Sequence, residues 1–283
     1  MPEPPEGLEP LEPLDCAPLL VPLHGELLSL LSGLHPTDWQ RPTVARQWSV
    51  KEIVAHLLDT DLRRLSFQRD GHPPPAPAEP ARGLVEHLNR LNAEWVVAAR
   101  RLSPQVLVDL LAWSGPRAAA LLSGLDPDGP AIFGVAWAGE ESSTHRFDVA
   151  REYTERWHHQ QQIRDAVGAR PLTSRRWLWP VFDTFVRALP HTYREVEAPE
   201  GTVIGLHIEG EAGGVWSLRR DSGRWGLWSG APAAPAAAAA LDQDTAWRVF
   251  TKGLDPAEAN RRMRLAGDAA LGAHVARMLC VMA

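Results

Sequence analysis

The sequence predicts an α+β multidomain protein, with a helical bundle in the N-terminal two thirds and a small α+β module after it. Up to about residue 190, apolar residues recur at helical spacing between clear helix start and stop signals. From about residue 198, short segments alternate between apolar and polar residues, as half-buried strands do. The length of 283 residues and the hydrophobic fraction of 45% are sufficient for two globular domains.

The first two helices have recognisable ends. A Leu-rich segment over residues 19–34 has helical spacing, and Gly33 is expected to stop it. The helix over residues 50–69 begins with a capping box, in which Ser49 is the N-cap and Glu52 reaches back to the Ser49 amide.

The helical pattern continues after a Pro-rich loop at residues 70–80. Ser103 and Pro104 have the residue types of an N-cap and a first helical position, and Gly168 has that of a C-terminal stop. Helices are expected over residues 82–102, 104–122, 144–167 and 174–189.

The C-terminal part has a different pattern. The segments TVIGLHIEG, VWSLRR, GRWGLW and RMRLAG are expected to be strands, and TAWRVFTKG and residues 268–281 helices. The Ala- and Pro-rich stretch 231–240 is expected to be a loop leading into a helix. We therefore predict a disordered tail (1–17), a helical bundle (18–195) and an α+β module (196–283).

Composition and charge argue against several classes of protein. The net charge of −6 and the lack of a basic stripe argue against a nucleic-acid partner. No apolar run approaches the roughly 18–20 residues of a membrane span, so no membrane contact is expected. The N-terminus MPEPPEGLEPLEPLD is acidic and Pro-rich, unlike an export signal. Cys16 and Cys280 form no disulfide or metal motif, which favours a reducing cytoplasm.

Three residues are candidate metal ligands. Glu155 and His159 are four residues apart on the expected helix 144–167, so both side chains lie on one face and can bind the same ion. His56 lies on the apolar face of the helix 50–69, and a buried histidine requires a partner. Zinc accepts this mixture of imidazole nitrogen and carboxylate oxygen. Other interpretations stay open: Glu155 and His159 form a solvated pair, His56 is a hydrogen-bonded core histidine, or Arg151 pairs with Glu155 instead. His158 competes with His159 as a ligand, but it points away from Glu155, so we treat it as a neighbour.

Other residues have candidate supporting roles. Asp59 follows His56 by one turn and is placed to orient its second nitrogen, and Gln162 faces the same side as His159. For both residues, an ordinary polar helix surface is an equally good interpretation. Trp48, Trp137 and Trp157 are candidates for pocket walls or core, and Arg248, Arg261, Arg262 and Arg264 are candidates for an anion clamp or solvated surface.

Two of these segments resemble a known family. WSVKEIVAH, which ends at His56, and ERWHHQQQI, which contains Glu155 and His159, resemble the DinB/YfiT-like metalloprotein superfamily, and within it the mycothiol-dependent maleylpyruvate isomerases. The more common DinB pattern has histidine in place of Glu155, so the glutamate favours the isomerase branch. TAWRVFTKGLDP and MRLAGDAALGAHVARML are similar to the sterol-carrier-like C-terminal domain of that branch.

The resemblance implies a fold, a site and a reaction class. The fold is an up-down four-helix bundle followed by a sterol-carrier-like α+β domain. His56, Glu155 and His159 would hold zinc or another divalent ion such as nickel. The cofactor would be a low-molecular-weight thiol, mycothiol or bacillithiol, used by an isomerase or S-transferase on a small electrophile. Bundles of this type often dimerise, so a homodimer is compatible. The alternative function is a non-enzymatic stress protein of the DinB type that binds a metal or small ligand.

Overall fold

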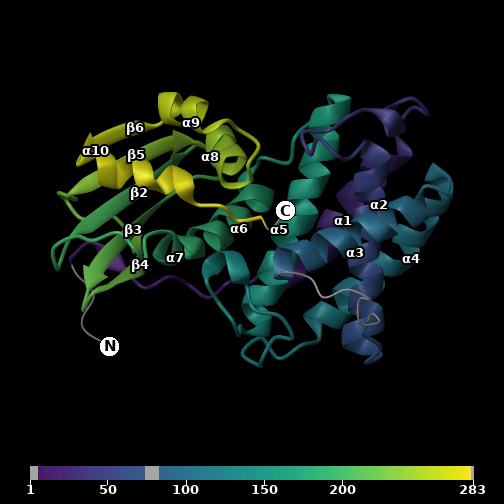
Figure 1. Ribbon diagram of the computed structural model, residues 1–283, viewed down its shortest axis with the longest axis horizontal. Helices are drawn as coiled ribbons and strands as arrows, with labels where there is room; N and C mark the ends of the chain where they lie inside the picture. The colour runs from purple at the N-terminus through teal and green to yellow at the C-terminus, as the bar shows by residue number, and fades with distance from the viewer. Residues whose placement is uncertain (1–5, 74–82, 282–283) are drawn as a thin grey trace. The chain divides into compact units, whose positions relative to one another are not determined.

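The computed structural model describes residues 6–73 and 83–281 and confirms the predicted α+β class. Contacts within the chain form two compact units. The helical unit comprises residues 15–132 and 143–172, and the sheet unit comprises the remaining described residues. Figure 1 shows both units.

The described residues of the helical unit form five α-helices, which pack around an apolar core. Helix α4 packs against α1 and α2, helix α5 packs against α1, α2 and α4, and helix α3 packs against α2 (Figure 1). Their bounds are α1 (Ala17–Ser32), α2 (Val50–Arg63), α3 (Leu84–Ala99), α4 (Pro104–Ser123) and α5 (His145–Val167). A 3₁₀ turn, η1 (Asp38–Gln40), precedes α2, and a π-helical segment, η2 (Arg64–Arg69), extends it.

The ends of these helices agree with the sequence signals. The Glu52 carboxylate accepts a hydrogen bond from the Ser49 amide at 2.9 Å, as the capping box predicts. Ser103 Oγ accepts from the Val106 amide at 3.3 Å at the start of α4. Gly168 ends α5 with a φ of 69°, a left-handed conformation that favours glycine.

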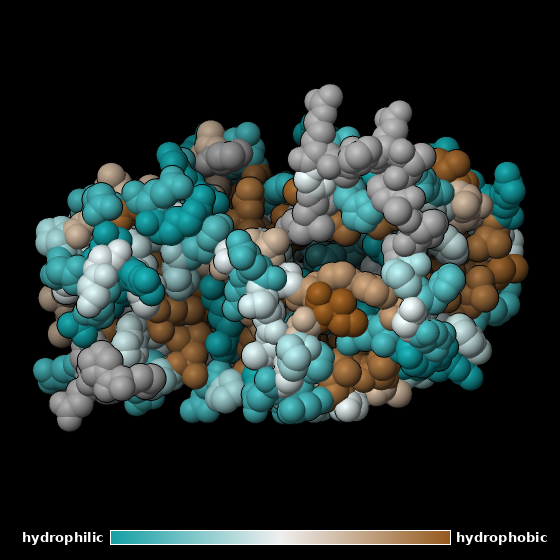
Figure 2. Space-filling model, turned by 60° about the horizontal axis from the view of Figure 1, so that its bottom comes forward, coloured by the Kyte–Doolittle hydropathy of each residue, from teal (hydrophilic) through white to brown (hydrophobic). Residues whose placement is uncertain are grey.

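Helix α4 corrects the expectation that no apolar segment approaches membrane length. Among the described residues, it is the one helix long and apolar enough to cross a membrane by length and composition. One of its faces is buried in the bundle core, through residues that include Leu107 and Leu111. Val106 and Trp113 are exposed, and apolar surface is visible at the right of Figure 2, where Figure 1 draws α3 and α4. Core helices of soluble bundles pass the same test, so the composition of α4 is weak evidence for a membrane.

Buried ion pairs hold α2 and its extension η2 against α5. The Arg64 guanidinium donates to both oxygens of Asp148 at 2.7 and 2.8 Å and to Glu152 at 3.0 Å. One turn away, Arg156 pairs with Asp61 at 2.6 Å. These contacts join residue 61 to 156 and residue 64 to 148, so α2 and α5 run antiparallel.

The sheet unit contains six strands in the order β1-β4-β3-β2-β5-β6. Strand β2 pairs with β5 in parallel, and the other neighbouring strands are antiparallel. The strands are β1 (Leu8–Glu9), β2 (Val203–Glu209), β3 (Gly214–Asp221), β4 (Arg224–Gly230), β5 (Ala237–Asp242) and β6 (Arg264–Gly267). The α-helices are α6 (Arg175–Phe185), α7 (Leu189–Thr192), α8 (Gln243–Phe250), α9 (Pro256–Arg262) and α10 (Ala269–Ala273).

The stretch 231–240 was expected to be a loop leading into a helix, but its second half forms β5. Alanine has a low strand propensity, so the sequence carries little strand signal there. The strand forms because β2 and β6 supply hydrogen-bond partners on both sides, and its small side chains fit a crowded face on which Ala237 and Ala239 are buried.

The N-terminal segment also has regular structure. Leu8 and Glu9 pair with β4, and Leu14 is buried, although residues 1–17 were expected to be disordered. Residues 1–5 of that tail, and residues 74–80 of the Pro-rich loop, lie outside the described residues. A compact unit is not the same as an independently folding domain, so the domain boundaries near residues 17 and 195 stay a prediction.

Replacing Arg64 with methionine tests the importance of the α2–α5 ion pairs. The substitution leaves the carboxylates of Asp148 and Glu152 buried with less compensation, so we expect the free energy of unfolding to fall by about 3–5 kcal/mol. Urea denaturation followed by circular dichroism measures this change. The matched substitution Arg46→Met, at an exposed arginine, should change it by less than about 0.5 kcal/mol. Equal effects of the two substitutions would contradict the prediction.

Candidate metal centre

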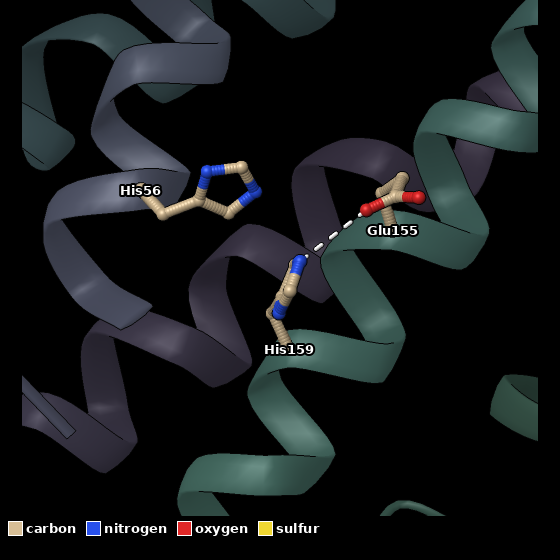
Figure 3. A group of neighbouring side chains, drawn as sticks. All are labelled: His56, Glu155 and His159. Atoms are coloured by element: carbon tan, nitrogen blue, oxygen red, sulfur yellow. Dashed lines mark ion pairs between the residues drawn. The ribbon is translucent and has the colours of Figure 1, made fainter. Parts of the chain in front are cut away.

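The structure brings the three predicted ligands together in the helical unit. His56 projects from α2, and Glu155 and His159 project from α5, toward a common point (Figure 3). One potential ligand atom from each residue lies within 4.8 Å of the other two. The Nε2 atom of His159 lies 3.3 Å from Oε2 of Glu155, and the His56 and His159 rings are 4.7 Å apart at their centroids.

Local helix geometry explains this arrangement. Glu155 and His159 share one face of α5 because four residues are slightly more than one helical turn. His56 follows Ile53 on the buried side of α2, and both residues are at most 6% exposed. The antiparallel packing of α2 on α5 then places the imidazole of His56 opposite the Glu155–His159 pair (Figure 3).

Electrostatics keep two of these side chains in the forms that bind metal. Burial, followed by the neighbouring charge of His159, lowers the pKa of His56 to about 3, so its imidazole is neutral at pH 7. Burial of Glu155 opposes ionisation. A hydrogen bond from His159 and the charges of His159 and Arg151 outweigh this effect and lower the pKa of Glu155 to about 2. A neutral imidazole and an ionised carboxylate are the forms that metals require.

Gln162, which is predicted to face the same side as His159, contacts that histidine directly. Gln162 Oε1 lies 2.9 Å from Nδ1 of His159, and Gln162 Nε2 lies 3.2 Å from Nε2 of His158. Nδ1 of His56 is buried without a hydrogen-bond partner. His158 therefore contacts the site through Gln162 and does not belong to the ligand group, in agreement with its treatment as a neighbour.

Arg151, the competitor for Glu155, and Asp59, the expected partner of His56, both pair with other residues. Arg151 pairs with Asp148 at 2.8 Å and Glu152 at 3.0 Å, and no ion pair with Glu155 is found among the described residues. Asp59 pairs with Arg63 at 3.0 Å and makes no recorded hydrogen bond to His56, so the suggested contact between them is absent from the described structure. Burial raises the pKa of Asp59 to about 6, although the charge of Arg63 opposes this.

The tryptophans separate into a wall residue and core residues. The ring of Trp48 lies 4.7 Å from that of His56 and 6.1 Å from that of His159, so it covers one side of the centre. Trp157 is buried and donates to Leu172 within the helical unit. Trp137 belongs to the sheet unit and packs against Phe185.

The four C-terminal arginines each pair with a carboxylate in the sheet unit. The pairs are Arg248 with Asp244, Arg261 and Arg262 with Glu258, and Arg264 with Glu209. These pairs are solvent-exposed and weak, so the anion clamp stays a prediction.

A buried ion-pair network beside the centre was not predicted from the sequence. Asp148, Glu152 and Arg156 recur every four residues on α5, and that spacing was the available signal. Their partners on α2 and η2 give no local signal, because Arg64 is 84 residues from Asp148 and 88 residues from Glu152.

The donor set fits a divalent metal ion. Two imidazoles and one carboxylate form a three-ligand set of the kind found in catalytic zinc sites, which leaves a fourth position for water or substrate. The second nitrogen of His159 has an oxygen acceptor, as metal-bound histidines usually do. The same set accepts nickel.

The pKa shifts predict how the stability of metal-free protein depends on pH. Burial lowers the pKa of His56 and that of His158 to about 3, below the ordinary histidine value of 6.5. Between these pH values, the unfolded chain takes up protons that the folded state does not. The contribution of each histidine is therefore complete above pH 6.5 and is lost toward pH 3, by about 1.4 kcal/mol per pH unit. Asp59, with its raised pKa, opposes this loss below about pH 6.

Urea denaturation of chelator-treated protein from pH 7 to 4 measures this slope. His158→Asn should make it shallower by one histidine's contribution, and His207→Asn, at an exposed histidine, should leave it unchanged. If the stability of His158→Asn depends on pH as steeply as that of wild type, the lowered pKa of His158 is not a cause of this dependence.

Comparisons with known proteins agree with the fold. Residues 20–164 match the family model of the mycothiol maleylpyruvate isomerase N-terminal domain. The chain is similar to crystal structures of the mycothiol-dependent maleylpyruvate isomerase and of a histidine-to-alanine mutant of it. Each has a TM-score of 0.51 and 13% identity, with 82% of this chain and 86% of that chain covered.

A search of curated proteins finds no match. At 13% identity the structural likeness supports the fold alone, whereas the family model covers slightly more than half of the chain. The chain therefore belongs to the mycothiol maleylpyruvate isomerase N-terminal domain family.

Proposed function

We propose that this protein is a metal- and thiol-dependent enzyme that isomerises a small electrophile or transfers a thiol to it. The observation that carries the proposal is the convergence of His56, Glu155 and His159 within 4.8 Å. Membership of a family named for a thiol-dependent isomerase supports the same reaction class. Mycothiol or bacillithiol is the proposed thiol, and a maleylpyruvate-like compound is the proposed substrate.

His56, Glu155 and His159 would hold the ion, with zinc as the first candidate and nickel as the second. When bound, such an ion supplies positive charge that stabilises a thiolate at neutral pH. The chain contributes a neutral imidazole from His56 and an ionised carboxylate from Glu155, so neither must lose a proton before binding. Helices α2 and α5 hold these donors on a rigid backbone, so little reorganisation is required when an ion binds.

The surroundings indicate from which side a ligand approaches. The side chain of Glu155 is 24% exposed and that of His159 is 10% exposed. The indole of Trp48 lies against the imidazole of His56, which is across the centre from Glu155 (Figure 3). We infer that a thiol or electrophile enters beside Glu155, while the indole of Trp48 excludes water from the other side.

The nucleophile would come from the small thiol. Cys16 and Cys280 are both buried and neither belongs to the ligand group, and burial raises the pKa of Cys280. When bound, a small thiol supplies a sulfur that adds reversibly to an activated double bond, which permits cis–trans isomerisation, or remains attached in an S-transferase. We place the protein in a reducing cytoplasm, where free cysteines and low-molecular-weight thiols persist.

A non-enzymatic protein that binds a metal or small ligand is the second candidate, because the same three residues can hold an ion without turnover. The two functions differ in one measurement, the thiol-dependent conversion of an electrophile. Only the enzyme forms a thiol adduct or a thiol-dependent isomer from an electrophile.

Metal analysis of purified protein is the first test. We expect about one zinc or nickel ion per chain and a lower melting temperature after chelation, because ligand binding to the folded state stabilises it. His56→Ala should lose the ion and the effect of the chelator. His207→Ala, at an exposed histidine of the sheet unit, should retain both. Wild-type protein that contains no stoichiometric metal after growth with zinc would overturn the metal centre.

A panel of thiols against model electrophiles is the second test. Wild-type protein should accelerate product formation with at least one small thiol, and His56→Ala should reduce the rate by two orders of magnitude or more, since the ligand set is incomplete. Metal-loaded wild type that turns over none of the pairs would favour the non-enzymatic candidate.

A further inference from the structure

We infer that Gln162 is a positioning residue, which holds His159 in the tautomer and orientation that present Nε2 to a metal ion. The inference deepens the proposed function and rests on its metal centre. The underlying observation is a buried chain of contacts in which the Gln162 amide lies between the His159 and His158 rings.

The oxygen and nitrogen of the Gln162 amide give this chain one direction. Gln162 Oε1, which only accepts, lies 2.9 Å from Nδ1 of His159, so that nitrogen carries a hydrogen. Gln162 Nε2, which only donates, lies 3.2 Å from Nε2 of His158, so that nitrogen offers its lone pair. His158 thus orients the amide, and the amide orients His159.

The consequence for His159 follows from imidazole chemistry. A neutral imidazole has one N–H group and one lone pair, and only the lone pair binds metal. In the neutral imidazole a hydrogen at Nδ1 leaves the lone pair on Nε2, so a metal ion at Nε2 would replace the hydrogen that Nε2 otherwise donates to Glu155, 3.3 Å away. An acceptor on the second nitrogen also raises the basicity of the ligand. His56 has no such acceptor, because its Nδ1 has no hydrogen-bond partner among the described residues.

Two neighbouring glutamines show that this role is specific to Gln162. Residues 160–162 are all buried on α5. Gln160 donates to the carbonyl oxygen of Leu23 at 3.1 Å, and Gln161 accepts from the Leu172 amide at 3.0 Å. These two side chains connect α5 to other segments of the helical unit. Gln161 therefore provides a matched control of the same residue type, helix and burial.

The experiment compares zinc affinity by chelator competition in wild type, Gln162→Leu, Gln162→Glu and Gln161→Leu. Gln162→Leu removes the acceptor and should weaken zinc binding by about 10- to 100-fold. Gln162→Glu keeps an acceptor opposite Nδ1 and should bind at least as tightly as wild type. Gln161→Leu should lower the melting temperature, because it loses the bond to Leu172, but leave the zinc affinity within about twofold of wild type.

The outcomes separate this inference from the proposed function. Wild type that binds no zinc would overturn the metal centre itself. Wild type that binds zinc, together with Gln162→Leu of equal affinity, would overturn only the role of Gln162. If Gln162→Leu does not fold, ¹⁵N NMR of zinc-loaded wild type tests the role of Gln162 instead. A hydrogen on Nδ1 of His159, protected from solvent exchange, supports the inference, and zinc bound to Nδ1 contradicts it.

Discussion

The packing of α2 against α5 is the constraint on which the candidate metal centre depends. His56 comes from one helix and Glu155 and His159 come from the other, so a small sliding or rotation between the helices would separate the donors. The ion pairs of Arg64 with Asp148 and Glu152 oppose such movement, because charged groups buried with fixed partners tolerate few alternative registers. The apolar core of the bundle supplies most of the attraction, and these polar contacts select the register.

Helix α5 has an unusual character for a bundle helix. It is buried over most of its circumference, yet many of the buried side chains are polar or charged, including glutamines, histidines and arginines. Each such side chain loses water on folding and requires a partner inside the protein. An apolar sequence would form a bundle at lower cost, so the partners that these side chains find indicate a chemical role for the interior. The Gln162 amide between two imidazoles is one such arrangement.

Local rules accounted for the parts of the structure that depend on local sequence. The Ser49–Glu52 capping box predicted the start of α2, and a spacing of four residues predicted that Glu155 and His159 share a face. The apolar stripe on α2 predicted that His56 faces inward, but not that it meets α5. The partners of Arg64 depend on helix packing across more than 80 residues of sequence, and no local pattern encodes them. Strand β5 depends on its neighbours in the sheet in the same way, because its alanines have little strand propensity.

The buried charges beside the centre have a consequence for electroneutrality. The guanidinium groups of Arg64, Arg151 and Arg156 are balanced by the carboxylates of Asp61, Asp148 and Glu152, which leaves Glu155 as the additional negative charge. A divalent cation held there would give the centre one net positive charge. A low-dielectric interior disfavours net charge, so a single monoanion in the fourth position would restore neutrality. The charge balance of the helical unit would then favour a thiolate over a neutral thiol.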